Sequence, residues 1–222
     1  MKYINRWALM RNTITENIAE HSLEVAMIAH CLATVRNTYY YDPPHGGSNV
    51  SEEPVDVGRV CLLAMYHDAS EIITGDMPTP VKYYAPEIRD AYKKVEHMAS
   101  EKLLAELPEE MQAIFRPIMI AQPGDKELWR IVKAADKISA LVKCVEEVSM
   151  GNQDFASAEQ TTRQAIEDMH LPEADFFLEH FLPSYRLDLD RQAAQEAGQK
   201  KEQEKNAWQT YTQLSSPFRG RG

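Results

Sequence analysis

The sequence predicts an all-α fold, and three observations lead to that prediction. Apolar residues recur at three- and four-residue steps through most of the first 186 residues, which is the helical period. The alternation typical of strands is nearly absent. Proline and glycine fall at intervals that would end helices of ordinary length. We therefore expect a bundle of six to seven helices.

The first expected helix begins near residues 15–17, whose side chains can cap it, and carries apolar residues up to Val35. The stretch 41–54 is rich in Pro, Gly and Ser and is expected to be a loop. A second helix is expected from about Asp56 to Gly75, a residue that favours a helix end. Residues 75–81 contain two prolines and are expected to be non-helical.

The remaining expected helices cover residues 86–107, 109–121, 126–150, 155–169 and 173–182. The composition then changes to a Gln- and Lys-rich tail with few apolar residues. Such a segment is typical of disorder or of a loosely docked helix. The sequence therefore predicts one domain over residues 1–187 and a C-terminal extension over 188–222.

Composition excludes several classes of function. The chain has 222 residues with 24 basic and 34 acidic side chains, a formal charge of −10. This balance argues against non-specific nucleic-acid binding, which needs a basic surface. The N-terminus lacks the apolar segment of a secretory signal, and continuous apolar runs are short, so we expect a cytoplasmic protein with no membrane partner. Three widely spaced cysteines predict neither a disulfide framework nor a thiolate zinc site.

Polar residues stand at positions that should be apolar. His67 and Asp68 interrupt the apolar run of the second helix, His21 lies on the apolar face of the first, and Asp136 is surrounded by small and branched apolar residues. A buried charge is costly unless it is paired or bound to metal. We therefore expect two imidazoles and two carboxylates to hold one divalent cation. This donor set suits Mn, Co, Fe, Ni or Zn, and open positions on the ion would indicate catalysis.

A simpler interpretation exists for each residue alone. A helical histidine is more often a hydrogen-bonded core residue, and Asp136 could pair with Lys133 or Lys137. The order His, His-Asp, Asp favours the metal hypothesis, because it is the pattern of the HD superfamily of phosphohydrolases. Glu71 follows Asp68 by three residues, so on a helix its carboxylate would lie on the same face and could accept or return a proton.

Longer segments narrow the resemblance. The stretches NRWALMRN (5–12), ENIAEHS (16–22), LAMYHDASEIITGDMPTPVK (63–82), KAADKISALVKC (133–144) and FLPSYRLDLD (181–190) closely resemble the YfbR-type HD-domain 5′-deoxynucleotidases. The resemblance implies an α-helical HD-domain bundle that forms a homodimer. It also implies removal of the phosphate from deoxyribonucleoside 5′-monophosphates with one divalent cation, often cobalt or manganese.

The resemblance implies a role for each matched residue. His21, His67, Asp68 and Asp136 match the metal ligands, and His21, Asp68 and Asp136 would also meet the substrate. Glu71 matches the acid/base residue, and Arg6 matches the arginine that orients the phosphate, which suits its planar charged fork. Trp7 matches the tryptophan beside the nucleotide. The substrate loop corresponds to Asp76, Met77, Pro78 and Thr79.

Two other functions remain open. The same fold could release triphosphate from deoxynucleoside triphosphates, which would need further basic side chains, with Arg11, Lys82 and Lys137 as candidates. The chain could also be a nucleotide-sensing protein without turnover, although a complete ligand set with Glu71 argues against that.

Overall fold

The computed structural model describes residues 1–41, 54–82 and 84–186. Within these ranges the protein is helical, and the strand-like pairing is one isolated bridge between Asn5 and Asn17. The predicted all-α class is confirmed. Seven of the described α-helices have nine residues or more: α1 (Ile18–Val35), α2 (Val57–Tyr66), α5 (Pro86–Ala105), α6 (Glu109–Met119), α7 (Lys126–Ser149), α8 (Ala156–Glu167) and α9 (Pro172–His180).

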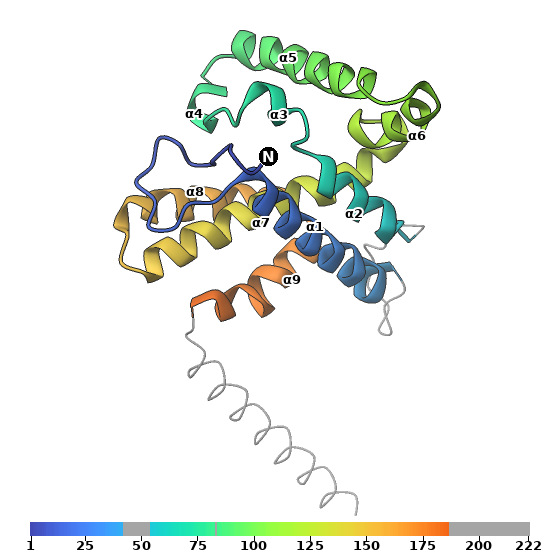
Figure 1. Ribbon diagram of the computed structural model, residues 1–222. Helices are drawn as coiled ribbons and strands as arrows, with labels where there is room; N and C mark the ends of the chain where they lie inside the picture. Colours follow the sequence, from blue (N-terminus) through green and yellow to red (C-terminus); the bar gives the residue numbers. More distant parts are fainter. Residues whose placement is uncertain (42–53, 83, 187–222) are drawn as a thin grey trace, which may run out of the picture. The chain divides into compact units, whose positions relative to one another are not determined.

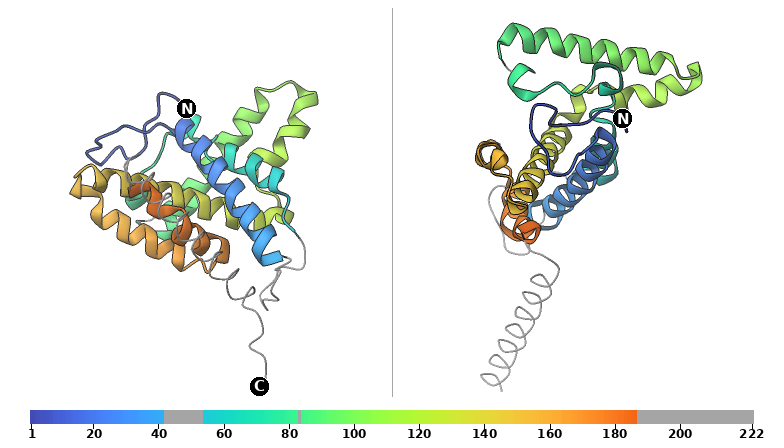
Figure 2. Two further views of the ribbon diagram at one scale, coloured as in Figure 1. Left: turned by 90° about the horizontal axis from the view of Figure 1, so that it is seen from below. Right: turned by 60° about the vertical axis from the view of Figure 1, so that its left-hand side comes forward.

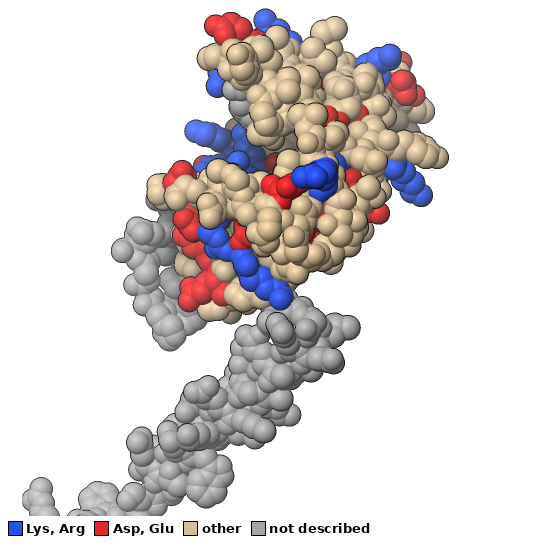
Figure 3. Space-filling view, turned by 90° about the vertical axis from the view of Figure 1, so that its left-hand side faces the viewer, with Lys and Arg blue, Asp and Glu red and all other residues tan. Residues whose placement is uncertain are grey.

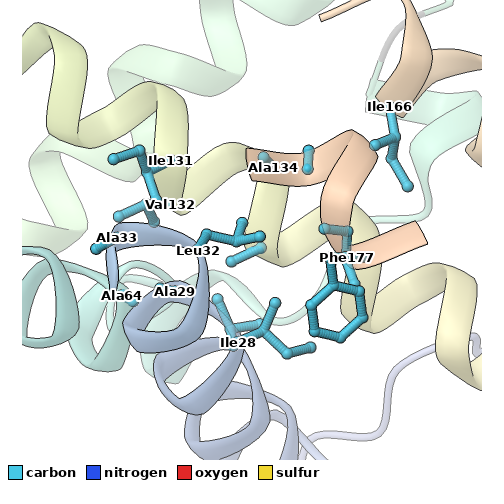
Figure 4. Close-up of a cluster of buried hydrophobic side chains, with 14 of the residues drawn as sticks. Ile28, Ala29, Leu32, Ala33, Ala64, Ile131, Val132, Ala134, Ile166 and Phe177 are labelled. Atoms are coloured by element: carbon cyan, nitrogen blue, oxygen red, sulfur yellow. The ribbon is translucent and has the colours of Figure 1, made fainter. Parts of the chain in front are cut away.

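The core forms where α1 crosses α2 and α7, with α9 packed against α1 (Figures 1 and 2). Ile28 and Leu32 of α1 point toward Phe177 of α9 (Figure 4), and Ile131 of α7 belongs to the same buried cluster. Leu32 is fully buried, so its truncation to alanine would cost about 2–5 kcal/mol of stability. Helices α1 and α7 therefore supply a rigid base for the polar side chains at the start of α1 and near the middle of α7.

Helix α1 starts where the sequence predicts. The Asn17 side chain accepts hydrogen bonds from the backbone N–H groups of Ala19 and Glu20, and the Glu20 carboxylate accepts one from the Asn17 N–H. This reciprocal capping box satisfies orphan donors at the helix start. The helix then passes into a π-helical segment, Arg36–Tyr41. The predicted loop 41–54 lies almost wholly outside the described residues.

The predicted second helix is interrupted, which corrects the expectation of one helix from 56 to 75. Helix α2 ends at Tyr66, residues 67–70 form turns, and α3 covers only Glu71–Thr74. The Ala64 carbonyl lies 2.7 Å from Nδ1 of His67, and it accepts the His67 backbone N–H at 3.4 Å. A side chain that binds a backbone carbonyl competes with the helical hydrogen bond to that carbonyl, and this favours the end of the helix in a tight turn. His67 and Asp68 therefore lie in a turn rather than inside a helix.

The expectation that residues 75–81 are non-helical is wrong in part. One turn, α4, forms over Thr79–Lys82. Pro80 is its second residue, where a missing N–H costs nothing because the first N–H groups of a helix have no internal partner. Gly75 has φ 72°, a left-handed conformation that only glycine adopts readily, so it ends α3 before the loop.

Helix α5 packs on α3, α6 packs on α2, and α8 packs on α7. Helices α3, α4 and α8 therefore flank the same region as residues 1–17, the N-terminal segment (Figures 1 and 2). By contacts the chain separates into a compact unit, Met1–Leu182, and a second unit, Pro183–Gly222. In the second unit a 3₁₀ turn ends at Arg186, and later residues lie outside the described part. The division at residue 187 stays a prediction.

One helical segment, Ile18–Tyr41, is long and apolar enough to cross a membrane by length and composition. More than half of its most apolar stretch is buried inside the protein, against α2 and α7. A buried core helix passes the same test, so this segment is weak evidence for a membrane span. The expectation of no membrane partner stays a prediction.

Candidate metal centre and nucleotide cavity

The N-terminal segment is held against the start of α1 by backbone hydrogen bonds. The Arg6 N–H donates to the Glu16 carbonyl at 2.9 Å, and the Ile18 N–H donates to the Ile4 carbonyl at 3.0 Å. Arg6 is therefore fixed beside the first turn of α1, although it lies near the chain start. Its guanidinium is largely buried and donates through Nη1 to the Glu16 carboxylate at 3.1 Å.

The four side chains predicted to share a cation lie together. His21 of α1 is fully buried, and its Nε2 lies 3.2 Å from Oδ1 of Asp136 and 3.5 Å from Oδ2 of Asp68. Nε2 of His67 lies 3.1 Å from Oδ2 of Asp68 and 4.0 Å from Oδ1 of Asp136. The two imidazole rings meet edge to face, with centroids 5.3 Å apart. Residues from α1, the turn after α2, and α7 thus converge at one point.

Three observations indicate that this cluster can hold a metal ion. Nε2 of His21 and Nε2 of His67 are buried and make no hydrogen bond within the described structure. One ligand atom from each of His21, His67 and Asp68 lies within 4.8 Å of the others. Burial lowers the pKa of His67, but the charges of Asp68 and Asp136 outweigh it and raise that pKa to about 9. A site that holds a proton so firmly has the field that stabilises a cation.

A chain of polar side chains lies behind His21. Its Nδ1 is 3.0 Å from the hydroxyl oxygen of Ser139, and Ser139 donates to the Glu24 carboxylate at 2.5 Å. Nη1 of Arg6 is 2.8 Å from the same Nδ1. Ser139, Glu24 and Glu16 carried no predicted role in the sequence. A signal was present, because Glu24 and Ser139 each follow a predicted ligand, His21 and Asp136, by three residues, which is a helical step.

Glu71 opens α3 and is 7% exposed, with Oε2 buried and unpaired within the described structure. Burial, together with the nearby charges of Asp68 and Asp76, raises the pKa of Glu71 to about 8. The sequence expected Glu71 on one continuous helix with His67 and Asp68. It instead lies across a turn from them, still close enough to be affected by the Asp68 charge. Near neutral pH this carboxyl group can hold a proton.

A cavity of about 630 Å³ adjoins the cluster. Arg6, Trp7, Asp76, Pro78, Thr79 and Asp136 line it among the predicted site residues, whereas Met77, His21, His67, Asp68 and Glu71 are not part of the lining. Further lining residues are Ala8, Leu9, Met10, Pro80, Lys137, Ala140, Ala158, Thr161, Thr162 and Ala165. Figure 3 shows a hollow on the face that carries α4, α8 and the N-terminal segment, with basic side chains visible in it. The size is typical of small-molecule sites.

Trp7 stands at this cavity in a strained backbone conformation. Its φ of 60° lies in the left-handed region, which bulky residues rarely adopt. Its ring packs against Phe155, with centroids 5.3 Å apart, and its carbonyl accepts a hydrogen bond from the Asn12 side chain at 3.2 Å. Such strain persists where surrounding contacts enforce it, and it is frequent at ligand sites.

The fold is that of the HD-domain phosphohydrolases. An HD-domain phosphohydrolase from Listeria innocua matches with a TM-score of 0.65 at 24% identity, over 84% of this chain and 85% of that one. The cyanophage S-2L HD phosphohydrolase (DatZ), solved with dA and one catalytic Zn²⁺ ion, matches with a TM-score of 0.54 at 20% identity, over 82% of this chain and 92% of that one. The likeness to these two structures defines the fold class.

Sequence similarity is more specific. The 5′-deoxynucleotidase YfbR-like family matches residues 1–185. A 5′-deoxynucleotidase of Vibrio vulnificus is 49% identical over 190 residues, which are 86% of this chain and 92% of that protein. The 5′-deoxynucleotidase YfbR of Escherichia coli O1:K1 / APEC is 46% identical over 86% of this chain and 90% of that protein. The chain belongs to the YfbR-like 5′-deoxynucleotidase family.

Proposed function

We propose that this protein is a 5′-deoxynucleotidase, which hydrolyses deoxyribonucleoside 5′-monophosphates to deoxynucleoside and phosphate and depends on a divalent cation. The observation that carries the proposal is the meeting of His21, His67, Asp68 and Asp136 beside a cavity that Arg6 also lines. Family membership over nearly the whole helical body supports it.

His21, His67, Asp68 and Asp136 would hold the cation, which is cobalt, manganese or a similar ion. When bound, the ion supplies Lewis acidity toward the phosphoryl group and lowers the pKa of water. Arg6 lines the cavity and is positioned by Glu16, with Nη2 3.9 Å from Oδ1 of Asp136. Its fork can bind two phosphoryl oxygens and stabilise the charge that develops on them.

Glu71 is the group that moves a proton in this proposal. The bond from phosphorus to the 5′ oxygen breaks as water adds, so the leaving oxygen needs a proton to depart as a hydroxyl. Glu71 is buried and protonated near neutral pH, which suits a donor at that oxygen. The attacking water gives up one proton as it becomes part of the product phosphate, and this proton returns to the Glu71 carboxylate, so that the group is protonated again for the next turnover.

Asp76 and Trp7 would select the sugar. Asp76 lines the cavity and can accept a hydrogen bond from the 3′-hydroxyl. In this proposal, side chains packed at C2′ would leave no space for a 2′-hydroxyl. Pro78 and Thr79 line the same wall. Trp7 is held rigidly by its backbone and by Phe155, so it can pack against the nucleoside at a low entropic cost.

The positions of the basic residues favour a monophosphate over a triphosphate. Arg11 has an 89% exposed side chain and pairs with Asp154 at 2.8 Å, and Lys82 pairs with Glu96 at 2.7 Å. Of the three basic candidates, Lys137 is the one that lines the cavity. A single additional basic side chain is too little to balance the charge of two additional phosphates. A sensor without turnover would not need the buried, protonated Glu71.

A phosphate-release screen tests the proposal. Purified protein is assayed against ribo- and deoxyribonucleoside mono- and triphosphates with Mn²⁺, Co²⁺ and Mg²⁺, and released phosphate is distinguished from triphosphate. We expect phosphate from deoxymonophosphates, and a protein that ignores them contradicts the proposal. A cytoplasmic homodimer acting on free nucleotides is part of the same proposal, and light scattering in solution tests the dimer.

A further inference from the structure

The cavity has two chemically different ends. Its charged residues are Arg6, Asp76, Asp136 and Lys137, which come from the N-terminal segment, the loop before α4, and α7. The wall contributed by α8 consists of Ala158, Thr161, Thr162 and Ala165 and carries no charge. These four residues follow one another at steps of three, one and three, so they share one face of α8.

Ala140 connects the two ends. It lies four residues after Asp136 on α7, about 6 Å further along the helix axis at 1.5 Å per residue. It lines the cavity, and α8 packs against α7. A ligand whose anionic group binds near Asp136 and Arg6 can therefore extend along α7 toward the uncharged face of α8.

The two threonines of this face differ in what their hydroxyl groups do. The Thr161 hydroxyl donates within its own helix, to the carbonyls of Ser157 at 3.1 Å and Ala158 at 3.2 Å. The half-buried Thr162 makes no side-chain hydrogen bond with the part of the chain that the structure describes. A hydroxyl can donate and accept, so Thr162 offers a polar contact to either type of group on a ligand.

We propose that this face of α8 is the wall against which the nucleotide base lies, with the Thr162 hydroxyl as its hydrogen-bonding contact. The inference rests on the proposed function, since it assumes that the phosphate lies at the charged end. The base is the uncharged, flat part of a deoxynucleotide. It therefore suits the part of the cavity whose lining side chains are uncharged and small. Alanine and threonine have small side chains, and larger side chains at these positions would reduce the volume of the cavity.

Thr162→Leu tests the wall by filling it. The kcat and KM are measured for dAMP, dGMP, dCMP, dTMP and 2-deoxyribose 5-phosphate, which has no base. We expect kcat/KM for the two purine nucleotides to fall by about tenfold or more, mainly through KM. The pyrimidine nucleotides lose less, and 2-deoxyribose 5-phosphate is unchanged.

Thr162→Val keeps the shape and removes only the hydroxyl. We expect the loss of the Thr162 hydroxyl to change kcat/KM by about 2–10-fold, by an amount that depends on the base. Ala158→Leu fills the same wall from another position, in case Thr162→Leu does not fold by circular dichroism. Gln160→Leu, an exposed position on α8 outside the cavity lining, is the matched control and should leave all five substrates unaffected.

The outcomes separate the two proposals. A parallel fall for all nucleotides and for 2-deoxyribose 5-phosphate, or no change in any folded wall variant, contradicts the base wall while the proposed function stands. A wild-type protein that releases no phosphate from any deoxymonophosphate contradicts the proposed function, and this inference with it.

Discussion

Nδ1 of His21 lies 3.0 Å from the hydroxyl oxygen of Ser139, which in turn donates to the half-buried carboxylate of Glu24. A histidine that binds a cation through Nε2 carries its proton on Nδ1, and Ser139 can accept that proton's hydrogen bond. A guanidinium only donates, so Arg6, at 2.8 Å from Nδ1, can bond to this atom only while it is unprotonated. Ser139 and Glu24 therefore favour the tautomer that the metal needs.

This relationship predicts that Ser139→Ala weakens metal binding. We expect an affinity for Co²⁺ or Mn²⁺ reduced by about 10–100-fold, the usual effect of removing a partner behind a metal-binding histidine. Isothermal titration of the metal-stripped protein measures it, and the visible spectrum of bound Co²⁺ reports any change in ligand geometry. Ser149→Ala is the matched control, because Ser149 lies on the same helix and, among the residues that the structure describes, its hydroxyl bonds only to the Val145 carbonyl. Equal affinities in both variants would exclude the role.

Glu16 is expected to hold Arg6 for the phosphate. Glu16→Gln removes the charge that pairs with Nη1 of Arg6 at 3.1 Å, so the guanidinium becomes less ordered. The KM for deoxymonophosphates should rise severalfold, whereas the affinity for metal in the absence of nucleotide changes little. Steady-state kinetics and metal titration measure the two effects separately. Glu87→Gln, an exposed carboxylate in the first turn of α5, serves as control. An unchanged KM would show that Arg6 does not need this partner.

The raised pKa of Glu71 predicts a trade between stability and activity. Its pKa in the fold is about 8, above the ordinary 4.5, so ionisation destabilises the folded metal-free protein increasingly as the pH rises from 4.5 to 8. Glu71→Gln should therefore abolish turnover and raise the Tm of the metal-free protein by a few degrees at pH 8. At pH 4.5 and below the difference should vanish. Calorimetry at both pH values measures it, and a Tm that falls at pH 8 contradicts the assigned environment.

Glu147 predicts the opposite dependence on pH. Burial raises its pKa, but Lys143, Asn152 and the backbone N–H of Thr13 donate to the carboxylate and hold its pKa below the ordinary range. Its contribution to stability is present above pH 4.5 and is lost as the pH falls further. Glu147→Gln should destabilise the protein at pH 7 by about 1–3 kcal/mol, and less at acid pH. Because Thr13 belongs to the segment that carries Arg6, KM should also rise.

Asp76→Ala is expected to reduce discrimination against ribonucleotides. Asp76 lines the cavity, and its loss removes the contact proposed for the 3′-hydroxyl and loosens the packing near C2′. The ratio of kcat/KM for deoxy- over ribomonophosphates should fall by about tenfold, with activity on deoxymonophosphates reduced. Paired assays on dAMP and AMP measure it. Equal losses on both nucleotides would sink the assigned role in sugar selection.

Much of the fold was predictable from sequence because its signals are local. The Asn17–Glu20 capping box and the apolar periodicity of α7 indicate these helices without tertiary information. The break after Tyr66 was not predictable, because the apolar pattern continues through it and the cause is a contact of His67 with the Ala64 carbonyl.

Part of the candidate site was likewise predictable from the sequence, and part was not. The meeting of His21, His67, Asp68 and Asp136 was predictable because charged groups within apolar stretches of sequence must satisfy one another. The wall of α8 was not predictable, because alanines and threonines carry no chemical signal until a cavity is seen beside them.

The most direct test of the account is the stoichiometry of metal binding. Metal-stripped protein is titrated with Co²⁺ or Mn²⁺, in parallel with Asp68→Asn and with Asp90→Asn, an exposed carboxylate outside the site. We predict one equivalent per chain for the wild-type protein and for Asp90→Asn, and none for Asp68→Asn, which keeps its helical circular dichroism. Phosphate release that continues in the metal-stripped protein, or unchanged binding by Asp68→Asn, would contradict the account.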